Sequence, residues 1–210
     1  LALAAAGGDA QRLLEEAGPA RVALLEALEA VAPETGYVRL DPDTVISPES
    51  LPAARRAAGA VVAAVDGVCG GDLDSAFCGV RPPGHHAERE RATGFCLYNN
   101  IAVGAAHAIA TYDVERVAIL DFDVHHGNGT EDIFSGDERV LFCSTFQHPF
   151  YPHSGDGPTA TNVVNTPLPA GTAGSGFREA VEQYWLPRLE AFAPELIIVS
   201  AGFDAHQADD

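Results

Sequence analysis

Two stretches of the sequence place aspartate and histidine at spacings that suit a metal site. In AILDFDVHHGNG an apolar run leads into Asp121, Asp123 and His125, and side chains at alternate positions of an extended chain point to the same side. Buried carboxylates require a cation or strong hydrogen-bond donors. Two carboxylates and an imidazole suit Zn²⁺ with a fourth position left open for water. Asp204, in VSAGFDAH at the end of another apolar run, can supply the third protein ligand.

A third stretch, VRPPGHHAERERATGFC, places His85 and His86 side by side behind a rigid Arg-Pro-Pro-Gly lead. Hydrolysis of an amide needs a group that takes a proton from water and delivers it to the leaving amine, and an imidazole can do both. Zn²⁺ lowers the pKa of its bound water from about 16 toward ~7. The rigid lead would hold both rings in place, because a misplacement of ~1 Å can lower the rate about 100-fold.

Each motif also has a plainer interpretation. The aspartates could cap backbone amides in turns after strands, and the adjacent histidines could be a polar loop pair without a role. All three motifs occur in one chain, and this combination favours the metal site.

For the remaining candidates the expected roles are a core histidine for His107, a turn residue for His206, surface histidines for His148 and His153, and a packed thiol for Cys96. Asp41 and Asp43 either grip a substrate at the rim or cap the turn beside Pro42.

The elements that must position these residues follow from the apolar pattern. The runs at 76–80, 117–122, 140–144 and 196–200 are short and continuous, as is typical of strands buried on both faces. Helical patterns lie between most of them, so we predict an α/β fold of three layers, α/β/α, with a mainly parallel sheet. Each predicted strand runs into His or Asp, and the carboxyl ends of such strands carry ligand sites. The predicted helices are 19–32, one capped by Ser50, 99–112 and one at 177–192 bent near Pro187, with a long surface loop at 151–176.

Charge and composition exclude several classes of protein. Twelve arginines, no lysine and 30 acidic residues give a net charge of −18. This charge argues against a nucleic-acid partner and would favour cationic substrates, although it also serves solubility. Apolar runs stay well below the ~20 residues of a membrane span. Four cysteines without a CxxC pair indicate reduced thiols, so we predict a cytoplasmic protein that contacts no membrane.

GHHAERERATGFCLYNN, DFDVHHGNGTEDIF and SAGFDAH together resemble, in this order, the motifs of the histone deacetylase superfamily. The likeness is strongest to its class II and bacterial members, including acetylpolyamine amidohydrolases, and runs from about Tyr37 to the last residue. It implies an arginase/deacetylase-like fold and zinc-dependent hydrolysis of an amide. The substrates it implies are acetylated lysine side chains, acetylated polyamines or other small acyl-amines.

The resemblance also implies roles for individual residues. Asp123, His125 and Asp204 resemble the zinc ligands, and the tandem histidines beside the zinc-bound water correspond to His85 and His86. The partners that orient these two histidines correspond to Asp121 and Asn128. The walls of the substrate channel correspond to Gly94, Phe95 and Tyr151, and a monovalent-cation site for K⁺ corresponds to Asp121, Asp123, His125 and Ser144.

We expect residues 1–210 to form a single deacetylase-like catalytic domain that is incomplete at both ends. In the family a later Gly-rich loop carries a tyrosine that donates a hydrogen bond to the developing oxyanion, and none of the five tyrosines stands in that context. One alternative is a non-catalytic module that binds zinc or acyl-lysine. The other is an arginase-type amidohydrolase with two Mn²⁺ ions, which needs more carboxylates; Asn128 and the tandem histidines speak against it.

Overall fold

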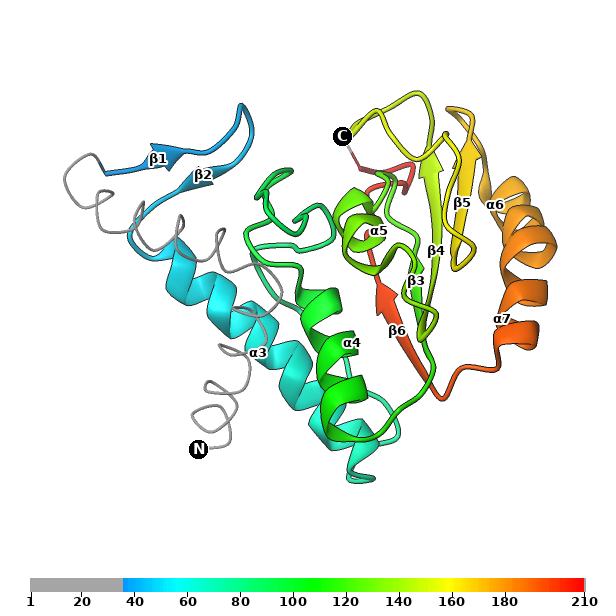
Figure 1. Cartoon of the computed structure of the whole chain (residues 1–210). Helices are drawn as coiled ribbons and strands as arrows, with labels where there is room; N and C mark the ends of the chain where they lie inside the picture. The colour runs from blue at the N-terminus through cyan, green and yellow to red at the C-terminus, as the bar shows by residue number, and fades with distance from the viewer. Residues whose placement is uncertain (1–35, 210) are drawn as a thin grey trace. The chain divides into compact units, whose positions relative to one another are not determined.

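A computed structural model of the chain describes residues 36–209 (Figure 1). The chain divides between Asp113 and Val114 into two units, which are described separately below. The predicted helix at 19–32 lies outside the described residues, and the single-domain organisation stays a prediction. Within the described part of the chain, no helix combines the length and the apolar character needed to cross a membrane.

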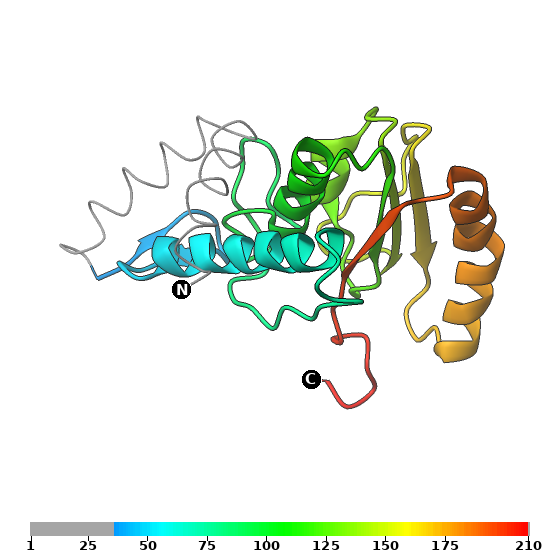
Figure 2. The ribbon, with the colours of Figure 1, turned by 90° about the horizontal axis from the view of Figure 1, so that it is seen from below.

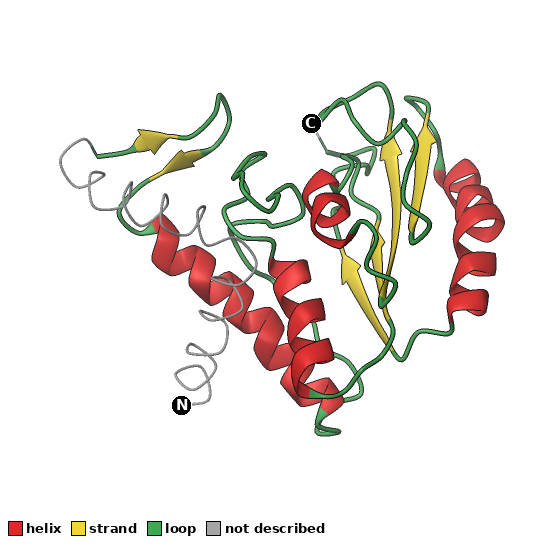
Figure 3. Ribbon diagram, in the orientation of Figure 1, coloured by secondary structure: helices red, strands yellow, loops and turns green. Residues whose placement is uncertain are grey.

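The first unit is built on two long helices, α3 (Ser50–Cys69) and α4 (Asn100–Thr111), and a hairpin of β1 (Val38–Arg39) and β2 (Val45–Ile46) (Figure 3). The predicted helix at 99–112 is confirmed, and Asn99 caps it by accepting a hydrogen bond from the Ala102 N–H at 3.0 Å. The prediction that Ser50 caps α3 is wrong. Glu49 occupies the cap position, and Ser50 Oγ instead accepts a bond from the Ser47 N–H at 2.9 Å.

The two helices pack closely because small residues line their contact. A Cβ on Gly104 would lie 2.5 Å from Val61 Cγ1, so only glycine allows α4 this close to α3. His107, buried on α4, has its Nε2 2.6 Å from Asp66 Oδ1 and its Nδ1 3.2 Å from Thr111 Oγ1. This confirms His107 as a core histidine whose polar atoms are satisfied, as buried polar groups usually are.

The strand predicted at 76–80 does not form, and this correction changes how the tandem histidines are carried. The segment is an irregular loop in which Phe77 is 82% exposed. A short apolar run contains no information about whether a partner strand lies beside it. His85 and His86 therefore belong to a loop and not to a strand end.

The second unit is a parallel sheet covered by helices, and it confirms the predicted α/β fold (Figures 1 and 2). Its strands, in the order β5-β4-β3-β6, are all parallel. The α6–η2–α7 segment packs Trp185 against Leu141 and Cys143 on one face, and α5 covers the other. The elements are β3 (Val117–Asp121), α5 (Asn128–Phe134), β4 (Val140–Gln147), β5 (Val163–Leu168), α6 (Gly174–Ala180), π-helical η2 (Val181–Trp185), α7 (Leu186–Phe192) and β6 (Leu196–Ser200).

The register of the sheet brings three predicted strand ends to one rim. Asp121 at the end of β3 pairs with Ser144 of β4 on one side and with Ser200 of β6 on the other. The residues that follow β3 and β6 therefore start from adjacent positions. This is the crevice at the carboxyl ends of the strands where open α/β sheets bind ligands.

Two boundaries in this unit differ from the prediction. β5 lies inside residues 151–176, which were predicted to be a surface loop. The prediction was wrong because Pro167 and Asn165 are residue types that are uncommon in strands. Pro167 is tolerated since β5 lies at the edge of the sheet that the described strands form. The predicted helix at 177–192 starts earlier and is irregular in η2, just before Pro187 in the first turn of α7.

Asn162, just before β5, ties the turn after α5 to the sheet. Its buried side-chain amide Nδ2 donates to the carbonyls of Phe134, Asp137 and Val140 at 2.7, 3.1 and 2.9 Å. Its Oδ1 accepts from the Gly136 N–H at 2.9 Å. A single side chain therefore satisfies one donor and three acceptors of the backbone.

Replacing Asn162 with alanine is expected to destabilise the second unit by about 2–3 kcal/mol, because buried backbone groups would lose their partners. The measurement is urea unfolding followed by the fluorescence of Trp185, the only tryptophan of the chain, which is buried in this unit. Thr161→Ala, at the exposed neighbouring position, should change stability by less than about 0.5 kcal/mol. Equal unfolding curves for the two variants would contradict the prediction.

Candidate metal centre

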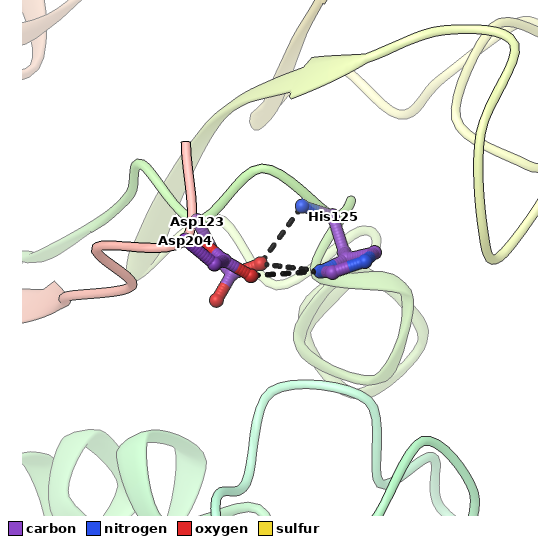
Figure 4. Close-up of side chains that lie close together, drawn as sticks. All are labelled: Asp123, His125 and Asp204. Carbon is purple, nitrogen blue, oxygen red and sulfur yellow. Dashed lines mark hydrogen bonds and ion pairs between the residues drawn. The ribbon is translucent and has the colours of Figure 1, made fainter. Parts of the chain in front are cut away.

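Asp123, His125 and Asp204 form a cluster at the rim of the sheet (Figure 4). His125 Nδ1 lies 2.9 Å from Asp123 Oδ1 and 3.1 Å from Asp204 Oδ2. Asp123 and His125 come from the loop after β3, and Asp204 comes from the loop after β6. All three side chains are partly buried, so they remain accessible to a small ligand.

The local backbone holds these side chains by turns and not by an extended strand. Asp123 Oδ1 accepts from the His125 N–H at 2.8 Å, and Asp204 Oδ1 accepts from the Val124 N–H at 3.1 Å. A Cβ on Gly202 would lie 2.0 Å from Asp123 Oδ2, so glycine is required there. The expectation that residues 121, 123 and 125 alternate along a strand is wrong, because β3 ends at Asp121.

The contacts within the cluster shift the pKa values of His125 and Asp204. Hydrogen bonds to Asp123 and then Asp204 raise the pKa of His125 to about 9, although burial acts in the opposite direction. Burial alone would raise the pKa of Asp204, but hydrogen bonds from His125 and the Val124 N–H outweigh it and lower the pKa to about 2. At neutral pH the imidazole of His125 is therefore protonated and the carboxyl group of Asp204 is ionised, so the cluster favours positive charge.

The donor set fits Zn²⁺. One ligand atom from each of the three side chains lies within 4.8 Å of the others, and no second group of this kind occurs within residues 36–209. Two carboxylates and one imidazole form a three-ligand set that leaves a fourth position open, as in catalytic zinc sites. The backbone donors to Asp123 and Asp204 orient the ligand oxygens, as outer partners of metal sites do. A bound metal would take the place of the His125 proton.

Asp121 lies beside this cluster but is not part of it. Its carboxylate is fully buried, and its Oδ1 accepts from the Asp123 N–H at 3.2 Å. A Cβ on Gly127 would lie 2.3 Å from Asp121 Oδ2, so the backbone after His126 closes over this carboxylate. Ser144, its partner in the register, is also fully buried.

Two features near the cluster were not predicted from the sequence. Phe150 stacks on His125 with ring centroids 5.1 Å apart, and the predicted channel residue Tyr151 meets the same ring edge-on at 6.0 Å. A pocket of about 440 Å³ also lies beside Asp123 and Asp204. Its walls are largely apolar, and Tyr151 is not among them. The sequence could have indicated Phe150 because it stands next to Tyr151. No feature of the sequence indicates the pocket.

In the first unit, the loop with His85 and His86 is held by the start of α4. The two rings pack with centroids 4.0 Å apart, and both are buried. Asn99 Nδ2 donates to the Ala87 carbonyl at 3.3 Å, and Asn100 Nδ2 donates to the Pro82 carbonyl at 3.1 Å. The rigidity expected from the prolines therefore has a second source, the adjacent asparagines of LYNN.

Gly94 and Phe95 form a tight turn beside the histidine pair. Gly94 has φ +57°, and a Cβ there would lie 2.4 Å from His86 Cδ2. Phe95 is 63% exposed, and its N–H donates to Thr44 Oγ1 at 3.1 Å. Asp41 Oδ1 in turn accepts from the Thr44 N–H at 2.6 Å, so Asp41 caps the turn beside Pro42. This supports the capping interpretation of Asp41.

Replacing Gly94 with alanine is expected to destabilise the first unit by about 2–5 kcal/mol. A left-handed backbone costs a non-glycine residue about 1–2 kcal/mol, and crowding of the His86 ring adds about 1–3 kcal/mol. Gly71→Ala is the matched control, because Gly71 has φ +81° but open space around its Cβ position. Thermal unfolding followed by circular dichroism measures both, and an equal loss in the two variants would rule out contact with His86 as the cause.

The other residues singled out in the sequence mostly contact nearby backbone or lie packed in the protein. Asn128 is the first residue of α5, and its N–H donates to the His126 carbonyl at 2.9 Å. His206 is exposed and accepts from the Ala208 N–H at 3.1 Å, which agrees with its expected role in a turn. His148 lies 3.4 Å from the exposed Asp156, and Cys96 is buried as a packed thiol.

Comparison with known proteins places this arrangement in a family. The model of the histone deacetylase domain matches residues 12–210. Among curated proteins, the chain is 46% identical over 179 residues to an uncharacterised protein of Synechocystis, covering 84% of this chain and 59% of that protein. It is 40% identical over 192 residues to a histone deacetylase-like amidohydrolase of Pseudomonas aeruginosa, covering 88% and 50%.

Solved structures agree with the sequence matches. The HDA15 HD domain superposes with a TM-score of 0.87 at 36% identity, covering 94% of this chain and 58% of that chain. An acetylpolyamine aminohydrolase from Burkholderia pseudomallei superposes with a TM-score of 0.74 at 36% identity, covering 80% and 51%. The chain thus spans about half to three fifths of the length of these relatives.

Proposed function

Because the chain belongs to the histone deacetylase family, we propose that it is a zinc-dependent amidohydrolase that removes acetyl groups from lysine side chains or polyamines. The observation that carries this proposal is the cluster of Asp123, His125 and Asp204, whose donor set suits catalytic zinc. Relatives named as a deacetylase-like amidohydrolase and an acetylpolyamine aminohydrolase support the substrate class. The net charge of −18 would favour approach of a substrate that carries further amines.

The chemistry follows from the residues in these roles. Asp123, His125 and Asp204 would hold the zinc ion, which lowers the pKa of a water molecule and polarises the acetyl carbonyl. His86 would take a proton from the attacking water at a ring nitrogen as the oxygen–carbon bond forms. It would then deliver that proton to the amine nitrogen as the carbon–nitrogen bond breaks, which leaves acetate and a free amine.

Asp121 and Asn128 are proposed to orient the two histidines, with Asp121 serving His85 and Asn128 serving His86. A carboxylate behind an imidazole keeps positive charge on the ring, and this charge stabilises an oxyanion that develops nearby. The close packing of the His85 and His86 rings, 4.0 Å between centroids, supports a joint role.

The substrate path is proposed to include Phe95 and Tyr151 as aromatic walls, with the Gly94 carbonyl accepting a hydrogen bond from the substrate amide. Cys96 Sγ already donates to that carbonyl at 3.2 Å, but a carbonyl oxygen has a second lone pair for the substrate. The exposed ring of Phe95 and the position of Tyr151 beside His125 support this path.

A monovalent cation such as K⁺ is proposed to bind at the base of the metal site. The buried side chains of Asp121 and Ser144 pair in register at the strand ends, and the Asp123 and His125 carbonyls would complete the ligands. Oxygen ligands of this kind suit a hard cation.

The test is release of acetate from an acetyl-lysine peptide and from N-acetylputrescine by the purified protein. Each substrate is assayed with zinc, after chelation, and after zinc is restored, and the bound metal is counted. Activity that disappears on chelation and returns with one zinc ion per chain is the expected result. Peptide or polyamine preference then assigns the substrate class.

Other outcomes would favour the alternatives. Two Mn²⁺ ions per chain with activity restored only by manganese would replace the proposal with an arginase-type hydrolase. One tightly bound zinc ion with binding of the acetylated peptide but no turnover would indicate a non-catalytic module. A folded protein that binds no metal would overturn the ligand assignment.

A further inference from the structure

Next to the turn that carries His125 lies a second polar cluster, which joins His126 to α5, β4 and β5 of the second unit. His126 Nε2 lies 2.6 Å from Glu131 Oε2 on α5, and its Nδ1 lies 3.2 Å from Ser144 Oγ on β4. Asn165 Nδ2 on β5 donates to the same Glu131 oxygen at 2.8 Å and to the Gly155 carbonyl at 3.0 Å. His126 itself is only 1% exposed.

We propose that His126, Glu131 and Asn165 are positioning residues that fix the turn carrying the metal ligand His125. The inference deepens the proposed function and rests on it, because it assigns this cluster to the metal site. His126 is the chain neighbour of His125, so any shift of the buried ring moves the backbone from which the ligand projects. Removing such an outer partner typically lowers metal affinity or activity 10- to 100-fold.

The hydrogen bonds determine the orientation of the His126 ring. Burial alone would raise the pKa of Glu131, but hydrogen bonds from His126 and Asn165 lower it, so this carboxylate is ionised and only accepts. Nε2 of His126 therefore donates to Glu131. Nδ1 of the same ring lies 3.2 Å from Ser144 Oγ, so both ring nitrogens have a polar partner.

Packing closes the space around the same ring. Phe146 lies with its ring centroid 4.5 Å from that of His126, and Phe142 lies at 6.3 Å. A Cβ on Gly155, which has φ +95°, would lie 2.8 Å from His126 Cδ2. This packing restricts movement of the His126 ring. The backbone of the adjacent residue His125 is restricted with it.

The geometry also excludes a different interpretation of the cluster. Ser144, His126 and Glu131 follow the hydroxyl, imidazole and carboxylate order of a nucleophilic triad. Ser144 is fully buried, however, and cannot reach a substrate. The cluster therefore holds neighbouring residues in place and does not form a covalent bond with a substrate.

The test compares zinc affinity and cobalt spectra of variants of the whole chain. Glu131→Ala is expected to weaken zinc binding about 10- to 100-fold in a competition assay with a chelating dye. Its Co²⁺-loaded form should also show a changed visible absorption spectrum, which reports the geometry of the ligands. Glu131→Gln, which keeps an oxygen acceptor, should recover most of the affinity. Glu138→Ala, at an exposed glutamate in the same unit, should match the unchanged protein.

A lower melting temperature with unchanged zinc affinity and an unchanged Co²⁺ spectrum would overturn the inference, because the cluster would then be structural only. If Glu131→Ala does not fold, Asn165→Ala replaces it with the same expected direction and a smaller loss. An unchanged chain that binds zinc but hydrolyses no amide would overturn the proposed function and leave this inference open to the same affinity test. A chain that binds no zinc would overturn both.

Discussion

Replacing Asp204 with asparagine is expected to abolish tight zinc binding and to lower amide hydrolysis about 1000-fold or more. The asparagine keeps the size of the side chain and an oxygen that can accept from the Val124 N–H. It removes the negative charge, so Asp123 and His125 alone would face the metal. Loss of several kcal/mol of charge stabilisation in the transition state corresponds to this fall in rate.

The measurement combines metal analysis with the acetyl-lysine assay. Asp209→Asn is the matched control, because Asp209 is an exposed aspartate five residues further along the same loop. It should retain one zinc ion and full activity. Zinc binding by Asp204→Asn at the unchanged stoichiometry and affinity would mean that Asp204 is not a ligand.

Replacing His86 with alanine or glutamine is expected to lower kcat about 100- to 10,000-fold, which is the usual contribution of a general acid or base. Zinc affinity should stay within about threefold, because His86 is not one of the three proposed ligands. The pH dependence of kcat/KM should lose the limb that belongs to this histidine. Glutamine fills the space beside Gly94 better than alanine, so a loss common to both variants reports chemistry and not packing.

His153→Asn provides the control for this experiment. His153 is an exposed histidine with φ +63°, a backbone conformation that asparagine tolerates. Its activity and pH profile should not change. A His86→Gln variant with at least a tenth of the original kcat would show that another group transfers the proton.

The sequence by itself indicated the candidate metal centre, because its residues lie in short motifs. The strand bounds at 196–200 and the start of the strand at 117 were predicted correctly, since continuous apolar runs end where polar ligands begin. Asp123, His125 and Asp204 were identified from residue type and from their place after those runs. The cap of α4 by Asn99 is equally local, because a capping side chain bonds to a residue three positions away.

Only the tertiary structure decided which segments pair and which polar groups meet. Residues 76–80 look like a strand but pair with no strand among residues 36–209, whereas β5 pairs with β4 despite Pro167. Asn165 lies 34 residues from Glu131, and their contact became visible only through the pairing of β5 with β4, which places Asn165 opposite Ser144. The physical reason is that strand pairing and buried hydrogen bonds depend on distant neighbours. A run of residues expresses its own propensity, but its place in a sheet is set by what lies beside it.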